Sequence, residues 1–215
     1  MRPWSDRWFE MSAYFRHLLN AVGPHGVHSP FVFDLLTFCS KSPIDISALQ
    51  QLKQLRAAMR RDSRRLQKTD WGTGKSGEVK VSSMAVRSAQ PLHHAIYIAR
   101  LAQQLRCKTI VELGTSLGFT TAALGLLNKE ARVFSIEGCM NTAQIAKENM
   151  ARLNVSNVSI LSGEAMNVML EWKTEILSAD FIFIDCNHTY LATENFISFF
   201  EASEKENLTI VLDDI

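Results

Sequence analysis

The chain has 215 residues, of which 47% are hydrophobic and 21% charged, a composition typical of one globular domain and too short for two ordinary ones. The formal net charge of +1 conceals a split: residues 1–100 contain 15 Lys and Arg against 7 Asp and Glu, whereas residues 101–215 contain 8 against 15. No apolar run approaches the roughly 20 residues of a membrane span, and the four cysteines lack zinc-ligand spacing, so we expect a cytoplasmic protein without a membrane partner.

Residues 1–79 are expected to form a helical N-terminal extension that covers the rest of the chain. Ser29-Pro30 predicts a helix start, with serine as the N-cap and proline at the first helical position. Residues 46–68 carry leucines at helical spacing and predict an amphipathic helix with an arginine-rich face. This basic segment, residues 53–68, could bind RNA phosphates in a nucleic-acid-binding module, or it could cover the acidic half of the chain. No aromatic residues interleave its arginines, as stacking on single-stranded bases requires.

The stretch DWGTGKSGE, residues 70–78, contains at Gly74-Lys75-Ser76 the Gly-Lys-Ser that ends a nucleotide-binding P-loop motif. A P-loop also needs a glycine five residues before its second glycine, a strand before the loop and a helix after it. Thr69 stands where that first glycine belongs, and the flanking residues RRLQK and GEVKV predict neither element. We therefore interpret residues 69–79 as a polar loop or as a mobile flap over a site built elsewhere.

Residues 80–215 alternate short β-branched runs with longer helical stretches. A helix at residues 91–105 is expected to lead into the first strand. Strands are expected at residues 109–113, 132–137, 158–161, 180–185 and 208–213, and helices at 120–127, 141–153 and 189–202. Such alternation predicts βαβ units, which build a doubly wound, mostly parallel α/β sheet of the Rossmann-like kind.

The stretch VELGTSLGFTT, residues 111–121, has the strand–turn–helix context that residues 70–78 lack. Gly114 can supply the tight turn and Gly118 the close packing of the helix start. A dinucleotide site needs a further glycine two residues after the first, where this chain has Ser116. A pyrophosphate is thus disfavoured, and a nicotinamide-dependent oxidoreductase is the weaker alternative.

The next two strands predict contacts to a nucleoside. Glu137 ends the second strand, 25 residues after Glu112, where a carboxylate can accept hydrogen bonds from both ribose hydroxyls. Gly163-Glu164-Ala165 follows the third strand as a small turn that can admit an adenine edge. Because Glu112 adds a negative charge before the first turn, we expect a ligand with a ribose, an adenine and a cationic or amino-acid-like group, without phosphates.

Residues 111–121 together with Glu137, residues 163–165 and Asp185 resemble the class I S-adenosylmethionine-dependent methyltransferases. The ELGTSLGFT motif is similar to that of the catechol- and caffeoyl-type O-methyltransferases, and HGVHSPFVFDLL, residues 25–36, resembles little-characterised bacterial relatives. That resemblance implies S-adenosylmethionine as the cofactor. The residues that it implies for the cofactor site are Glu112, Gly114, Thr115, Ser116, Gly118, Thr120, Glu137, Gly163, Glu164, Ala165 and Asp185.

The ends of the fourth and fifth expected strands carry the candidate chemistry. Asp185 and Asp213 should meet at the carboxyl edge of the sheet, and with Asp214 they could hold a magnesium ion. The metal-dependent relatives have an Asp-Asn pair where this chain has Asp213-Asp214, and a lysine base where it has His188. His188 is therefore a candidate general base, or else part of the loop before a helix capped by Asn187 or Thr189. Asp185 also has a plainer possible role beside the cofactor's methyl group.

The sequence thus predicts a methyltransferase that acts on a hydroxyl of a small or medium-sized molecule, with Asp185 and His188 as catalytic residues and with metal use left open. An RNA methyltransferase that uses the basic segment is the alternative, and a homo-oligomer stays open. Because the chain ends after the fifth strand, whereas the resembling fold usually has seven, we expect a C-terminally truncated domain that could be inactive in this form.

Overall fold

The computed structural model of the chain describes residues 8, 11–16, 19, 28–69 and 76–213. The chain divides into two compact units, Met1–Ser42 and Pro43–Ile215. In the first unit, helix α2 (Pro30–Lys41) begins as predicted, with Ser29 as the N-cap and proline in the first turn. Among the helices of the described ranges, none combines the length and the apolar character that crossing a bilayer requires.

The second unit is built on a five-stranded parallel sheet with the strand order β5-β4-β3-β6-β7. Its strands are β3 (Thr109–Leu113), β4 (Arg132–Glu137), β5 (Val158–Ser162), β6 (Phe181–Ile184) and β7 (Thr209–Leu212). These strands confirm the predicted doubly wound α/β fold. The sheet grows in one direction from β3 to β4 and in the other from β3 to β6, and ligands bind at such a reversal of strand order.

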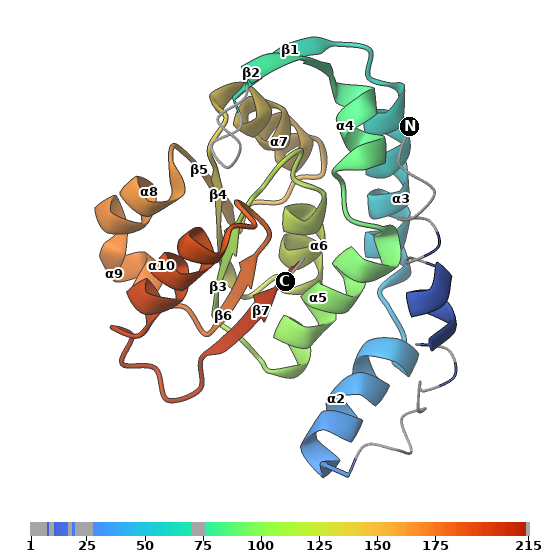
Figure 1. The fold of residues 1–215 in the computed structure, drawn as a ribbon. Coiled ribbons are helices and arrows are strands. Elements are labelled where there is room, and N and C mark those ends of the chain that lie inside the picture. The colour runs from blue at the N-terminus through green and yellow to red at the C-terminus, as the bar shows by residue number, and fades with distance from the viewer. Residues whose placement is uncertain (1–7, 9–10, 17–18, 20–27, 70–75, 214–215) are drawn as a thin grey trace. The chain divides into compact units, whose positions relative to one another are not determined.

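Helices cover both faces of the sheet (Figure 1). One face carries α5 (Leu92–Gln104), α6 (Phe119–Leu127) and α7 (Met140–Arg152), close to the bounds expected from the sequence. The other carries α8 (Ala165–Glu171), α9 (Lys173–Leu177) and α10 (Tyr190–Phe200). Two short helices that the sequence pattern did not predict, α8 and α9, fill the connection between β5 and β6.

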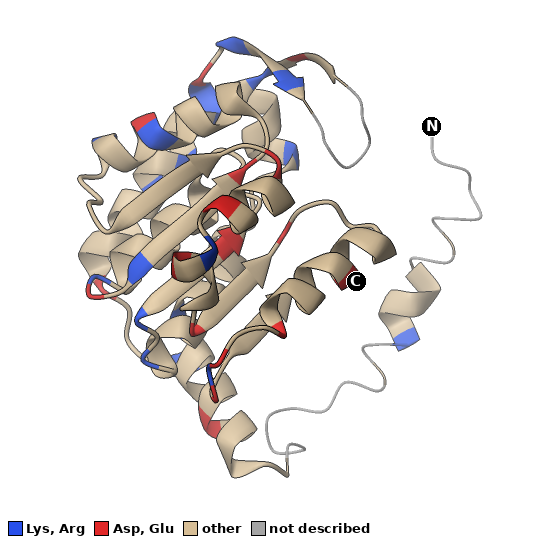
Figure 2. Ribbon diagram, turned by 90° about the vertical axis from the view of Figure 1, so that its left-hand side faces the viewer, with Lys and Arg blue, Asp and Glu red and all other residues tan. Residues whose placement is uncertain are grey.

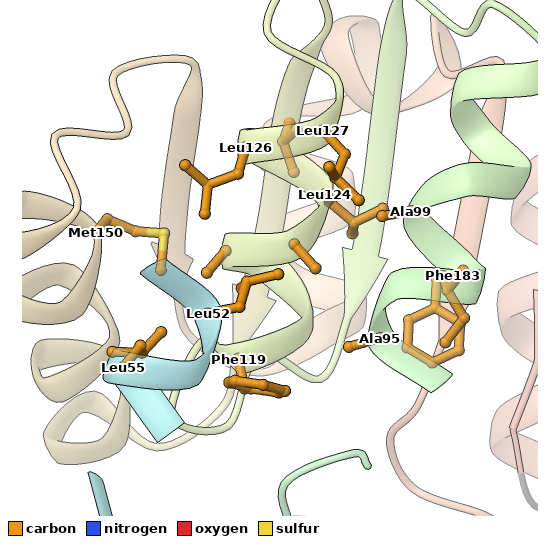
Figure 3. Close-up of a cluster of buried hydrophobic side chains, with 14 of the residues drawn as sticks. Leu52, Leu55, Ala95, Ala99, Phe119, Leu124, Leu126, Leu127, Met150 and Phe183 are labelled. Atoms are coloured by element: carbon orange, nitrogen blue, oxygen red, sulfur yellow. The ribbon is translucent and has the colours of Figure 1, made fainter. Parts of the chain in front are cut away.

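Side chains that alternate along each strand divide the core into two clusters. Phe181 and Phe183 of β6 pack with the α5–α6 side, while Ile182 and Ile184 pack with the α10 side. Figure 3 shows the first cluster, in which Leu52 lies beside side chains of α6. Because both faces of a parallel sheet are buried, its strands read as continuous apolar runs, which is why they were predicted well.

The segment before the sheet differs from its prediction. The expected helix over residues 46–68 ends earlier, since α3 spans Ile46–Arg61 and is followed by an antiparallel hairpin of β1 (Arg65–Thr69) and β2 (Ser76–Lys80). The expected loop over 69–79 is therefore partly strand, and α4 (Val81–Arg87) follows it. Residues 70–75 lie outside the described residues. The compact units divide after Ser42, whereas the sequence analysis places its boundary after residue 79, so α3 and the hairpin belong to the sheet-bearing unit.

Candidate functional site

A cavity of about 590 Å³ lies at the carboxyl ends of the strands, where the strand order reverses at β3. Eight of the predicted site residues line this cavity: Gly114, Ser116, Glu137, Glu164, Ala165, Asp185, His188 and Asp213. They come from the ends of all five strands or from the loops that follow them. The fold therefore brings together most of the side chains that the sequence analysis selected.

The turn after β3 forms one wall of the cavity, and it needs glycine at two positions. Gly114 has φ +104°, and a Cβ there would approach the main-chain oxygen of Asp185 to 2.1 Å. Gly118 has φ +80° at the start of α6, and a Cβ there would meet Ala146 of α7 at 3.0 Å. Both conformations are rare for residues with a side chain. The first glycine thus lets the turn pass against the end of β6, and the second lets α6 pack on α7.

Glu137 lies at the end of β4 and is tied to the turns on either side of it. Its Oε2 accepts a hydrogen bond from the main-chain N–H of Ser116 at 2.7 Å, and its Oε1 accepts one from the N–H of Cys139 at 2.9 Å. The two main-chain bonds hold the carboxylate in a fixed orientation at the cavity wall.

Five of the residues expected at the cofactor do not line the cavity: Glu112, Thr115, Gly118, Thr120 and Gly163. Thr115 and Thr120 are buried, and the Thr115 hydroxyl forms a hydrogen bond with Ser135 at 2.6 Å. Gly163 has φ +150°, and its N–H donates to the main-chain oxygen of Glu137 at 3.0 Å. These residues shape the turns beneath the cavity and do not form its surface.

Glu112 is fully buried between β3, β4 and α6. Its Oε2 accepts hydrogen bonds from the hydroxyls of Thr121 and Ser135, both at 2.5 Å, whereas its Oε1 has no partner among the described residues. Burial disfavours the charged form and raises the pKa of Glu112 to about 8. The side chain is therefore a neutral, buried acid at pH 7 and supports the glycine turn from below.

Asp185 and Asp213 meet at the carboxyl edge of the sheet, as the sequence predicted, but a third residue lies between them. The Nε2 of Gln90 donates hydrogen bonds to Asp185 Oδ2 at 3.1 Å and to Asp213 Oδ2 at 2.6 Å. Burial raises the pKa of Asp185 to about 6, and the charge of Asp213 acts in the same direction, while the Gln90 hydrogen bond opposes it. Gln90 was not predicted from the sequence. Its only signal is Pro91, since a proline favours an extended conformation in the residue before it.

Gln90 is itself held by the basic helix α3. The guanidinium of Arg56 donates to the Gln90 main-chain oxygen at 2.5 Å and lies 5.0 Å from the centre of the Phe119 ring. Arg64 pairs with Asp62 and with Glu148. Several arginines of the basic segment thus bind within the protein, and α3 ends before residue 62, so the continuous basic helix over 53–68 is wrong.

His188 lies beside the acidic pair, with its Nε2 3.8 Å from Asp185 Oδ1. The next helix is capped by Thr189, whose hydroxyl accepts a hydrogen bond from the N–H of Ala192. Of the two predicted caps, Asn187 and Thr189, it is therefore Thr189 that caps the helix, and His188 lines the cavity. Asp214 lies outside the described residues, and the remainder of the described chain contains no cluster of three His, Cys, Asp or Glu side chains able to hold a metal ion.

Comparison with known proteins agrees with this geometry. Residues 111–215 match the model of a family described as a methyltransferase domain. Over 86 residues the chain is 29% identical to the protein-L-isoaspartate O-methyltransferase of Idiomarina loihiensis, a segment that covers 39% of each of the two proteins. The chain thus matches about two-fifths of the length of this curated relative.

Solved structures share the fold. An O-methyltransferase from Bacillus cereus in complex with SAH (S-adenosylhomocysteine) has a TM-score of 0.57 at 21% identity, over 85% of this chain and 72% of that one. The SAH-bound methyltransferase PaMTH1 of Podospora anserina has a TM-score of 0.59 at 15% identity, over 90% and 73%. Residues 111–215 therefore match a methyltransferase-domain family, and the chain shares its fold with these solved methyltransferases.

Proposed function

We propose that this protein transfers a methyl group from S-adenosylmethionine to a hydroxyl oxygen of a small or medium-sized substrate. One observation carries the proposal: the glycine turn, Glu137, the Glu164-Ala165 turn and Asp185 all face the same cavity at the reversal of strand order. When bound, the cofactor supplies an electrophilic methyl group on a sulfonium centre. The residues of the cavity would bind it, orient the acceptor and take up the acceptor's proton.

The charges of the cavity favour a cationic ligand over a pyrophosphate. Four carboxylates line it, those of Glu137, Glu164, Asp185 and Asp213, against the basic side chains of Lys68 and Arg87. Such a surface attracts a sulfonium and an ammonium group and repels two phosphates. The nicotinamide alternative is therefore disfavoured by electrostatics as well as by the missing glycine in the turn.

Within this proposal Glu137 would accept hydrogen bonds from the ribose hydroxyls, because its carboxylate lines the cavity at the end of β4. Gly114 and Ser116 would approach the methionine portion through the main chain, where a bulky turn residue would not fit. Glu164 and Ala165, at the start of α8, would border the adenine. Glu112 would act indirectly, as the buried support of the turn.

We assign to His188 the role of accepting the proton of the substrate hydroxyl. Its Nε2 would accept this proton, and Asp185, 3.8 Å away, would stabilise the imidazolium that forms. The hydroxyl oxygen would then attack in line, with its lone pair forming the new bond as the bond from the methyl group to sulfur breaks. Holding both reactants in one cavity accounts for much of such a rate enhancement.

A magnesium ion is an optional second element of the proposal. Asp185 and Asp213 would provide two carboxylate ligands, which suits an ion that usually keeps several waters and binds one or two carboxylates. The Gln90 amide would have to turn away from both carboxylates for the ion to bind. A bound magnesium ion would lower the pKa of the substrate hydroxyl that it coordinates.

The test combines calorimetric titration with turnover. Wild-type protein is expected to bind S-adenosylmethionine and SAH, and not NAD. Glu137→Ala should lose most of that affinity, whereas Glu171→Ala, an exposed acid on α8, should not. His188→Ala should retain SAH binding but lose turnover with a hydroxyl-bearing acceptor, and treatment with EDTA should show whether a metal takes part.

Two outcomes would contradict the proposal. A folded wild-type sample that binds neither adenosyl ligand has no cofactor site of this kind. Equal and small effects of Glu137→Ala and His188→Ala on both measurements would remove the assigned roles.

A further inference from the structure

The cavity contains cationic side chains that the cofactor proposal does not use. Lys68 lies on β1, on the half-buried face of the strand that it shares with Leu66, and Leu66 packs against the core. Arg87 lies in the last turn of α4. Both line the cavity, and neither forms an ion pair with a residue of the described ranges, in contrast to Arg64 and Arg65, which pair with carboxylates.

The two cations belong to different ends of the cavity. The main chain on either side of Lys68 contacts Cys139, through Gln67 O and Thr69 N, so Lys68 lies near Glu137 at the proposed ribose end. Arg87 is three residues from Gln90, a distance of at most roughly 11 Å along an extended chain. Because Gln90 touches Asp185 and Asp213, Arg87 belongs to the end where the acceptor would react.

At that end the carboxylates already have a partner. The amide of Gln90 bridges Asp185 and Asp213, and neither carboxylate forms an ion pair with Arg87 within the described structure. The guanidinium therefore keeps its charge and its donors for a ligand. A guanidinium binds carboxylates and phosphates with two parallel hydrogen bonds, and Phe196 adds an aromatic side chain to the same cavity.

From these contacts we propose that the methyl acceptor is an anion, and that Arg87 binds its carboxylate or phosphate group while its hydroxyl lies at His188. The inference rests on the proposed function and deepens it, because it names the charge class of the substrate. Arg87 is thus a specificity-determining residue. It would favour anionic acceptors over neutral ones of the same size.

The test uses calorimetric titration of the full chain saturated with SAH. Benzoate, phenyl phosphate and benzyl alcohol serve as a carboxylate, a phosphate and a neutral probe of similar size. At least one anion is expected to bind about tenfold more tightly than benzyl alcohol, as a charge-assisted pair of hydrogen bonds allows. The difference between the two anions identifies which group the site prefers.

Variants show whether Arg87 is responsible. Arg87→Gln should abolish the preference for the anion, Arg87→Lys should keep part of it, and Arg61→Gln, an exposed arginine outside the cavity lining, should leave it unchanged. SAH affinity should be the same in all four proteins. The preference should also weaken as salt is raised.

Three results would overturn the inference. Benzyl alcohol could bind as tightly as the anions, or no probe could bind at millimolar concentration, or Arg87→Gln could lower SAH affinity, which would assign Arg87 to the cofactor's own carboxylate. Because SAH binding is measured in the same samples, its failure in wild-type protein would mark failure of the proposed function itself. Normal SAH binding without a preference for anions would refute this inference alone.

Discussion

The buried acid beneath the glycine turn makes a quantitative prediction about stability. Glu112 is replaced by glutamine, which keeps the size of the side chain and an acceptor for the hydroxyls of Thr121 and Ser135. In the folded wild type the pKa of Glu112 is raised from 4.5 to about 8 by burial. The folded state therefore holds a proton that the unfolded chain releases between these two pH values.

The sign follows from proton linkage. Between pH 4.5 and pH 8 the folded state binds more protons at this position than the unfolded state, so the free energy of unfolding falls as the pH rises. The stabilising effect of the bound proton is complete below pH 4.5 and lost as the pH passes through 8. Each pH unit in this window costs about 1.4 kcal/mol, so wild type should lose about 3 kcal/mol relative to Glu112→Gln between pH 5 and pH 7.

Urea unfolding of cofactor-free protein, followed by circular dichroism at several pH values from 5 to 8, measures this difference. Other titrating groups, Asp185 among them, change both proteins alike and cancel in the comparison. Glu171→Gln, a change at an exposed acid, should run parallel to wild type. If the curves of Glu112→Gln and wild type also run parallel, Glu112 ionises at its ordinary pKa in the folded protein and the buried-acid reasoning is refuted.

Three further substitutions test the packing around the site. Gly114→Ala should destabilise the fold by about 3 kcal/mol through backbone strain and steric overlap, and it should abolish SAH binding in titrations. Gly77→Ala should do neither, because a Cβ added at Gly77 would have no atom within 4 Å. Gln90→Ala should reduce turnover while SAH affinity stays within about twofold of wild type, because it removes only about one hydrogen bond to each carboxylate; an unchanged turnover would deny it a positioning role. Leu52→Ala should cost about 2–5 kcal/mol in urea unfolding, because Leu52 is fully buried in the core of the sheet-bearing unit. Ile46→Ala, at a side chain 71% exposed, should cost far less.

The sheet could be predicted because its strands are short, apolar and buried on both faces. The bounds expected for β3 and β4 agree with the structure. The hairpin could not be predicted in the same way, because RLQKT and SGEVK are polar and half exposed. Leu66 continued the helical spacing of α3 in the sequence, yet it reaches the core from a strand, so one apolar residue fitted two different structures.

The position of a site residue could be predicted where the main chain alone determines it. The direction in which a side chain points was harder to predict. Gly114 and Asp185 lie at strand ends and therefore at the carboxyl edge of the sheet. Glu112 is two residues before Gly114, inside a strand whose faces are both buried, so its side chain points into the core beneath α6. Strand alternation between Val111 and Leu113 could have indicated this, whereas the motif alone placed the acid beside the ligand.

The split of charge along the sequence has a structural explanation that does not need nucleic acid. Figure 2 shows Lys and Arg residues on the β1–β2 hairpin, and the carboxyl edge of the sheet carries the acids of the cavity. Arg64 pairs with Glu148 across 84 residues, and Arg56 holds the segment that bridges Asp185 and Asp213. The basic half thus provides cover and orientation for an acidic site. Under the proposed function, such an acidic site binds a cationic cofactor, and Arg87 adds a positive charge at the acceptor end.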